Sequence, residues 1–172
     1  MQRRTEPMTS PPSVDPRELR NALGTYPTGV TIVTTLDANG AFVGLTVNSF
    51  SSLSLDPPLV LWSLNVRSPN LAAFDRAPYF AVNVLAEEQV EISRHFAKRG
   101  ARFERLEVHT GLGGVPLLAG CAAHIQCRTD ARHNGGDHVL FIGRVERLAY
   151  DVAKRPLVFW GGRYHSAGGA LL

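Results

Sequence analysis

The sequence predicts a single mainly β domain, an antiparallel barrel with a few short helices. Segments rich in β-branched and aromatic residues recur along the chain, and turn residues such as Gly, Pro, Asn and Asp separate them. The helical segments between them are few and short, which favours a barrel over an alternating α/β fold. A chain of 172 residues is expected to form one domain whose core needs neither disulfides nor metal ions.

The N-terminal segment differs in composition from the rest of the chain. Residues 1–14 hold three prolines and many polar groups, so we expect a flexible arm there and a folded domain over residues 15–172. Asp15 precedes a proline and is followed three positions later by Glu18, which predicts the N-cap of a short helix. Gly24 is expected to end that helix.

In the remaining sequence, strands are predicted from the spacing of apolar residues and from segments rich in β-branched and aromatic residues. The expected strands are 29–35, 41–47, 59–64, 79–85, 121–129, 138–148 and 156–160. The expected turns are 37–40, where Asn-Gly is a strong hairpin signal, and 132–137. Short helices are expected over 68–76 and 86–96, and an irregular excursion over 112–118.

Composition argues against several classes of protein. The net charge is +3, the pI is about 9.2, and no basic stripe interleaved with aromatic residues occurs, so nucleic-acid binding is not expected. No apolar run reaches the length of a membrane helix, and no apolar segment follows the N-terminal methionine, so we expect no membrane association and a cytoplasmic protein. The six histidines show no metal-ligand spacing, and no metal site is expected.

Two cysteines, Cys121 and Cys127, fall on one predicted strand. Six residues of extended chain separate Cα atoms by roughly 20 Å, far beyond the reach of a disulfide. Two reduced, partly buried thiols are expected.

The segment 44–58 is the first candidate binding site. A strand runs out into a polar loop that holds one Thr, one Asn and four Ser. Small hydroxyl groups and free backbone N–H groups suit an anionic, hydrogen-bonding ligand such as a flavin. The alternative is an ordinary serine-rich turn before Pro57 and Pro58.

Two further segments have candidate binding chemistry. Residues 63–70 offer an arginine, two serines and a helix N-terminus, which suits a phosphate, although Ser68 as a plain N-cap explains them equally well. In Gly135-Gly136-Asp137-His138 the carboxylate of Asp137 can orient the imidazole of His138 toward a ligand; the alternative is a simple hairpin turn. No Rossmann fingerprint, P-loop or nucleophile elbow occurs, so any nicotinamide cofactor is held by another kind of fold.

The order of these motifs resembles the short-chain flavin reductase family, the reductase components of two-component flavin-dependent monooxygenases. The resemblance covers about residues 17–165. Its matching segments are 26–35, 44–50, 55–60, 80–85, 136–138 and 156–159.

The resemblance implies an FMN-binding split barrel that forms a homodimer, with the flavin near the subunit interface. It implies an NAD(P)H-dependent flavin reductase that uses NADH or NADPH to reduce FMN, or FAD, for a separate partner monooxygenase. The sequence leaves open which nicotinamide and which flavin are used, and whether the flavin stays bound. Alternatives are a flavin- or heme-binding split-barrel protein without turnover, a pyridoxamine-phosphate oxidase-like enzyme, and a non-enzymatic DNA- or protein-binding barrel module.

The resemblance also implies roles for individual residues. His138 is implied as the catalytic, nicotinamide-side residue, and Tyr164 as a cover of the same pocket. His95 and Phe96 fall at the phosphate end, where family members often have Arg or Lys. The residues implied along the isoalloxazine are Gly44, Leu45, Thr46, Val47, Asn48 and Ser49; those implied along the ribityl and phosphate groups are Ser63, Leu64, Asn65, Arg67 and Ser68.

Overall fold

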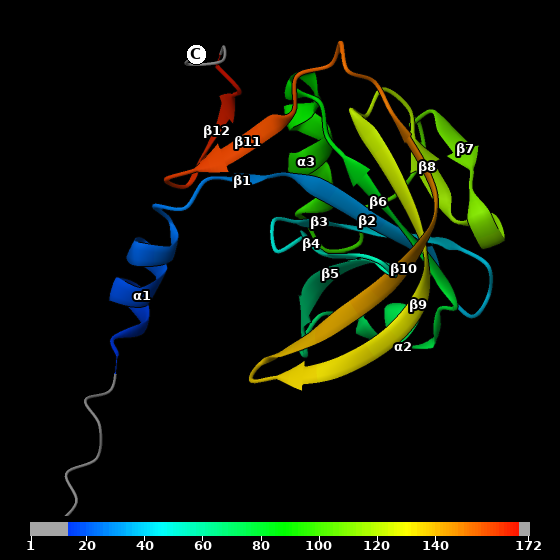
Figure 1. Cartoon of the computed structure of the whole chain (residues 1–172), viewed down its shortest axis with the longest axis horizontal. Coiled ribbons are helices and arrows are strands. Elements are labelled where there is room, and N and C mark those ends of the chain that lie inside the picture. Colours follow the sequence, from blue (N-terminus) through cyan, green and yellow to red (C-terminus); the bar gives the residue numbers. More distant parts are fainter. Residues whose placement is uncertain (1–13, 169–172) are drawn as a thin grey trace, which may run out of the picture.

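The computed structural model describes residues 14–168 and is built around a seven-stranded antiparallel sheet (Figure 1). The order of the strands is β3-β2-β6-β9-β10-β5-β4, and the two edge strands, β3 and β4, do not pair with each other. The elements are α1 (Pro16–Leu23), β1 (Thr28–Gly29), β2 (Thr31–Leu36), β3 (Phe42–Val47), β4 (Ser51–Leu55), β5 (Pro58–Asn65), α2 (Leu71–Arg76), β6 (Tyr79–Val84), η1 (Glu87–Gln89), α3 (Val90–Phe96), β7 (Val108–Thr110), η2 (Leu112–Gly114), β8 (Pro116–Leu118), β9 (Ala123–Gly135), β10 (His138–Tyr150), β11 (Leu157–Trp160) and β12 (Arg163–Ser166).

The predicted mainly β, antiparallel fold is confirmed. Smaller sheets accompany the main one: β1-β11-β12 and β7-β8. The predicted helix after Asp15 is confirmed, since the Asp15 side chain accepts hydrogen bonds from the N–H groups of Arg17 (2.8 Å) and Glu18 (3.0 Å). The predicted arm, apart from residue 14, lies outside the described residues.

The core is divided between the two faces of β2, whose residues 31–35 are all buried. Because side chains alternate along a strand, Val33 joins one cluster and Ile32 the other. The first cluster contains Trp62, stacked on Phe141 with ring centroids 4.7 Å apart. The second packs α3 against the main sheet through Phe96, which is 2% exposed.

The long hairpin of β9 and β10 corrects the predicted turn at 132–137. Strand β9 runs on to Gly135, and the loop consists of Gly136 and Asp137 only. Gly136 has φ of 65°, a left-handed conformation that glycine adopts without strain and that permits a two-residue loop. His138 therefore begins β10 directly after the loop.

The predicted polar loop after residue 47 is also corrected. Residues 51–55 form β4, which pairs with β5 from Ser51↔Leu61 to Leu55↔Pro58. Its sequence alternates serine and leucine at an exposed sheet edge, where a strand needs few apolar residues. The predicted irregular excursion at 112–118 contains η2 and the short strand β8.

Helix α1 stands apart from the barrel (Figure 1). None of its residues is buried, and Leu19 and Leu23 are 48% and 65% exposed. Within residues 14–168, no helix is long and apolar enough to cross a membrane. Cys121 and Cys127 are both free and buried, and burial raises the pKa of each thiol to about 12.

Candidate functional site

A pocket of about 290 Å³ opens where the end of β3, helix α3 and the β11–β12 hairpin meet. We call it the Tyr164 pocket; Thr46, Asn48, Ser93, Phe159 and Tyr164 contribute to its lining. Three of these, Thr46, Asn48 and Tyr164, are sequence-predicted site residues from two distant segments. The structure brings them to one place.

A second pocket of about 730 Å³, the α1 pocket, lies between α1 and the β11–β12 turn. Asn48 and Phe159 line both pockets, so the two adjoin. Together they have the size of a site for a nucleotide cofactor, which commonly spans a few hundred to 1,000 Å³. Tyr26 and Trp160 add aromatic surface to the α1 pocket and are 73% and 51% exposed.

A chain of hydrogen bonds runs along one wall of the Tyr164 pocket. The Thr46 hydroxyl donates to the backbone carbonyl of Ser93 at 2.7 Å, and the Ser93 hydroxyl lies 2.9 Å from the Tyr164 hydroxyl. The Arg94 guanidinium carbon lies 5.7 Å from the centre of the Tyr164 ring. Sequence reasoning missed Ser93, because nothing in a short helix indicates a contact 71 positions along the chain.

Several predicted site residues use their side chains in packing. Val47 and Leu64 are buried in the first core cluster, and Phe96 is buried in the second. Gly44 is buried beneath Phe96 and Phe103, and Leu45 packs against the first cluster. Because Leu45 and Val47 point into the core while Thr46 points toward α3, the flavin contacts predicted for the apolar residues would have to be made by their backbone groups.

Ser49 connects the two predicted flavin segments. Its hydroxyl accepts a hydrogen bond from the Ser63 N–H at 3.0 Å and lies 3.2 Å from the Ser63 carbonyl oxygen. The exit of β3 is thereby tied to β5. The segments predicted for the ring and for the phosphate are thus neighbours in space.

The predicted phosphate segment also meets the β9–β10 loop. In the β5–β10 register His138 pairs with Asn65, and the Val66 N–H donates to the Asp137 carbonyl at 2.9 Å. The Asn65 side-chain oxygen accepts from the Arg67 N–H at 2.9 Å, which shapes the turn toward Ser68. Sequence reasoning proposed these two segments separately, and the structure places them side by side.

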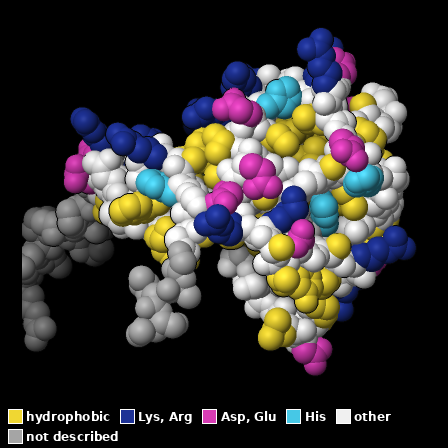
Figure 2. Space-filling model, turned by 90° about the horizontal axis from the view of Figure 1, so that it is seen from above, with side chains coloured by type: hydrophobic (Ala, Val, Ile, Leu, Met, Phe, Trp, Pro, Cys, Tyr) yellow, Lys and Arg dark blue, Asp and Glu magenta, His cyan; other side chains and the backbone are white. Residues whose placement is uncertain are grey.

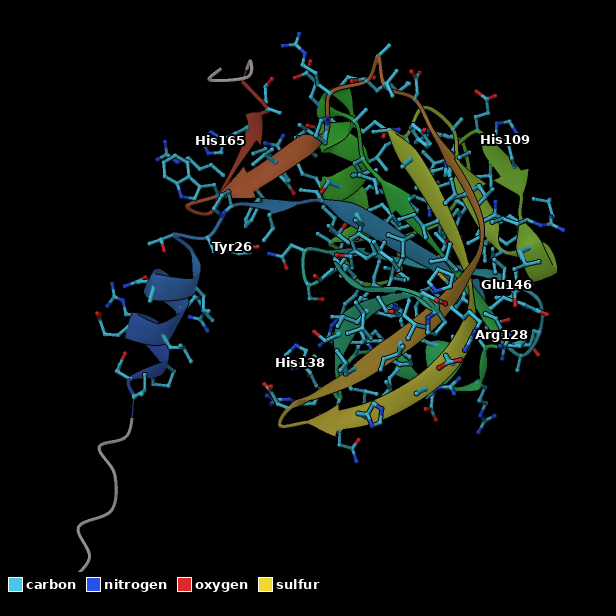
Figure 3. The ribbon with its side chains drawn as sticks, in the orientation of Figure 1. Tyr26, His109, Arg128, His138, Glu146 and His165 are labelled. Atoms are coloured by element: carbon cyan, nitrogen blue, oxygen red, sulfur yellow. The ribbon has the colours of Figure 1, made fainter. Side chains whose placement is uncertain are left out.

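Asp137 orients His138 in the way the sequence suggests. The Nδ1 atom of His138 lies 2.7 Å from an oxygen of Asp137, which leaves Nε2 for another partner. The hydrogen bond to His138, followed by the charge of that imidazole, holds the pKa of the Asp137 carboxyl below its usual range. Figure 3 shows His138 at the tip of the long hairpin, on the same side of the domain as Tyr26.

His95 has a partner within the chain. Its Nε2 lies 2.7 Å from the carbonyl oxygen of Arg102, and since a carbonyl only accepts, Nε2 carries the proton and donates it there. That nitrogen is not free for a phosphate. Lys98, Arg99 and Arg105 follow closely in the same loop and add positive charge near the end of α3.

The residues present fit a flavin. The isoalloxazine needs a flat, partly apolar slot with polar groups at its edge, and the nicotinamide needs room beside it. The two adjoining pockets, which share Asn48 and Phe159, together offer that room, with Thr46 and Tyr164 lining the smaller one. Arg67 is exposed and forms no ion pair with any residue among 14–168, so its charge is available for a phosphate. Across the same range, no three His, Cys, Asp or Glu side chains gather as metal ligands do.

Comparisons with known proteins support a relationship to flavin reductases. Residues 23–168 match the flavin reductase like domain. The chain is 44% identical over 148 residues to FMN reductase (NADH) SmoA of Agrobacterium fabrum, covering 86% of this chain and 84% of the relative. It is 43% identical over 153 residues to the reductase subunit HsaB of a flavin-dependent monooxygenase from Rhodococcus jostii, covering 88% and 78%.

A solved structure shares the fold. The Streptomyces globisporus NADH:FAD oxidoreductase SgcE6, in complex with NAD and FAD fragments, superposes with a TM-score of 0.86 at 36% identity, covering 94% of this chain and 99% of that one. The resemblance inferred from the ordered motifs is confirmed, and the chain belongs to the family of flavin reductase-like domains.

Proposed function

We propose that this protein is an NAD(P)H-dependent flavin reductase that supplies reduced flavin to a separate flavin-dependent monooxygenase. The observation that carries the proposal is the Tyr164 pocket, where Thr46, Asn48 and Tyr164 converge beside a larger aromatic-lined pocket. Relatives that cover most of the chain are named NADH-dependent flavin reductases and monooxygenase reductase subunits, which supports both parts.

The chemistry asks little of the protein beyond orientation. A bound FMN or FAD would supply the two-electron acceptor for the hydride of NADH or NADPH, and residues such as Thr46, Asn48 and Tyr164 would hold it in the pocket. Holding two planar rings in reacting geometry is itself a large contribution to rate. The described residues therefore act by binding and positioning, and no side chain needs to exchange a proton with carbon.

His138 is the proposed nicotinamide-side residue. Asp137 occupies Nδ1 at 2.7 Å, so Nε2 is the ring nitrogen that remains for a ligand. We infer that this nitrogen contacts the nicotinamide nucleotide and contributes mainly to its binding. The side chain is 42% exposed, which leaves it accessible.

We infer that two copies of the chain form a homodimer. Leu19 and Leu23 lie one turn apart on α1 and are exposed together. An isolated helix shorter than about 12 residues is marginal in water, so the eight residues of α1 need a surface to pack on. Figure 2 shows the projecting end of the molecule with basic side chains and hydrophobic ones beside them, and a second copy would cover the hydrophobic part.

The function is tested by anaerobic titration of the purified protein with FMN and FAD, followed by NADH and NADPH, while the flavin absorbance is recorded. We expect one nicotinamide to bleach a flavin rapidly and only in the presence of the protein. A protein that binds flavin, or heme, without bleaching it on addition of either nicotinamide would exclude the reductase function.

The role of His138 is tested by His138→Ala, with the exposed His109→Ala on β7 as matched control. We expect the first variant to raise the Michaelis constant for the nicotinamide roughly tenfold, in line with loss of one hydrogen bond to a charged ligand. The control should match the wild type. Unchanged Michaelis constant and turnover in His138→Ala would refute the role.

A further inference from the structure

We propose that Ser93, a residue of α3, is a positioning residue that sets the hydroxyl of Tyr164 for nicotinamide binding. The inference rests on the proposed function. It concerns a residue that lines the pocket, acts through the side chain of Tyr164, and is singled out by no sequence motif.

Ser93 joins the two walls of the Tyr164 pocket. Its backbone carbonyl accepts the hydroxyl proton of Thr46 on β3 at 2.7 Å, and its own hydroxyl lies 2.9 Å from that of Tyr164 on β12. Ser93 is 0% exposed, so water does not compete for either contact. One residue of α3 therefore fixes the position of a polar group on each side of the pocket.

The ring of Tyr164 is held in place independently of Ser93. It packs edge-on against Phe159, its cross-strand neighbour, with ring centroids 5.4 Å apart, and the Arg94 guanidinium lies 5.7 Å from its centre. Loss of the Ser93 hydroxyl should leave the ring where it is. What it removes is the fixed direction of the phenol O–H, which lies at the edge of the pocket.

The bond leaves Tyr164 a defined capacity for a ligand. A phenol oxygen can donate once and accept. With Ser93 as one partner, the Tyr164 hydroxyl cannot rotate freely, and its remaining hydrogen-bonding position has a fixed direction. A ligand that uses this position therefore does not lose free energy in ordering the hydroxyl. The Ser93 hydroxyl has no other partner among residues 14–168, which indicates that it serves this contact.

The arrangement also explains why Thr46 cannot donate to a ligand. Its single hydroxyl proton goes to the Ser93 carbonyl, so only its lone pairs remain for the pocket. The backbone carbonyl of Ser93 thereby leaves Thr46 as an acceptor at the flavin edge, whereas the Ser93 hydroxyl directs Tyr164 across from it. Only the second contact depends on a serine at this position, so it is the one that Ser93→Ala removes.

The test compares Ser93→Ala, Tyr164→Phe and the double variant with wild type. The control is Thr35→Val near the C-terminal end of β2, away from the pocket. This nearly isosteric change removes the hydrogen bond from the buried Thr35 hydroxyl to the Tyr79 carbonyl (2.7 Å). For each, the Michaelis constant for the nicotinamide and the turnover number are measured at saturating FMN. The dissociation constant of oxidised NAD is measured by calorimetry, which needs no turnover.

We expect Ser93→Ala and Tyr164→Phe each to raise the Michaelis constant and the NAD dissociation constant about threefold to tenfold, as for one neutral hydrogen bond, with turnover changed less than about twofold. Because Ser93 acts through Tyr164, the double variant should be no worse than Tyr164→Phe alone. Thr35→Val should melt earlier yet bind NAD as the wild type does. If Ser93→Ala does not unfold cooperatively, Ser93→Cys, whose thiol is a weak hydrogen-bond partner, replaces it with the same expected direction.

Multiplying effects in the double variant, or NAD binding by a folded Ser93 variant equal to wild type, would overturn the proposal. A wild-type protein that binds NAD but reduces no flavin would refute the proposed function while the binding comparison still decides the role of Ser93. A wild-type protein that binds neither NAD nor NADP would refute both, and if only NADP binds, the same comparison of variants is made with NADP.

Discussion

Replacing Gly44 with alanine tests the close contact between β3 and α3 on which the Tyr164 pocket is built. A Cβ at Gly44 would lie 2.9 Å from Cζ of Phe103 and 3.0 Å from Cε1 of Phe96. Carbon atoms in good contact are about 3.5–4.0 Å apart, so one neighbour has to move. Phe96 is 2% exposed and enclosed by the core, whereas Phe103 is only half-buried and can yield.

The expected cost is that of moderate overpacking. Inserting a methyl group into a packed core costs about 1–3 kcal/mol, and because Phe103 can yield partly, we expect about 2 kcal/mol for Gly44→Ala. For a domain of this size that corresponds to a melting temperature lower by about 4–8 °C. Gly29→Ala is the matched control, since a Cβ there meets no atom within 4 Å and Gly29 also lies on a strand.

The assay is thermal and urea unfolding of both variants and the wild type at one protein concentration without added flavin, because ligand and self-association shift apparent stability. We expect Gly29→Ala to unfold within about 1 kcal/mol of wild type, as glycine-to-alanine changes do at compatible positions. A Gly44→Ala variant as stable as Gly29→Ala would refute the packing explanation. It would indicate that Gly44 is needed because the flavin lies against its backbone. In that case Gly44→Ala should lower the affinity for FMN and leave the free energy of unfolding unchanged.

Three further outcomes are expected. Leu23→Glu on α1 should shift the protein toward the monomer in sedimentation equilibrium; a wild type that is itself monomeric at micromolar concentration would contradict the homodimer. Cys121 and Cys127, with thiol pKa values raised to about 12, should react with a disulfide reagent at pH 8 only after unfolding; fast labelling of the native protein would contradict their burial. Carbon NMR should show the Asp137 carboxyl titrating below its ordinary pKa, and this pKa should rise in His138→Ala. Because the pKa is lowered in the folded protein, the small stabilisation from this exposed pair is present above the ordinary pKa of the carboxyl. It is lost as the pH falls through the lowered pKa of the folded protein.

The sequence was sufficient for the main strands, because alternation and turn residues report local structure directly. The roles of the three candidate segments stay predictions. It was insufficient for β4, where Ser-Ser-Leu-Ser-Leu has the composition of a loop and becomes a strand only by pairing with β5. It also placed the β9–β10 turn too broadly, because Asn134 and Gly135 are turn-forming residues that here continue the ladder. In both cases tertiary pairing overrode local preference.

In the candidate site, too, the sequence indicated single segments but not the contacts between them. The grouping of Asn65 with His138 follows from the register of β5 and β10, which a local pattern does not contain. The family motif indicated Gly44 as a flavin contact. In the structure Phe96 and Phe103 pack so closely on Gly44 that they leave no room for a side chain. Ser93 was missed altogether, since its contacts are with Thr46 and Tyr164 on two other elements.

These particulars connect the packing of α3 to the chemistry of the pocket. Gly44 lets α3 approach β3 closely, and that approach brings the Ser93 carbonyl within 2.7 Å of the Thr46 hydroxyl. The same helix carries the Ser93 hydroxyl to Tyr164. Phe103 relieves only part of the clash in Gly44→Ala, and the Phe96 ring, 3.0 Å from the added methyl group, is enclosed by the core and has to move with α3. An outward shift of α3 should disturb both walls of the pocket, so Gly44→Ala should also weaken NAD binding, and in the double variant with Ser93→Ala the two effects should not multiply. Independent effects on NAD affinity would show that the position of α3 and the direction of the Tyr164 hydroxyl are separate features.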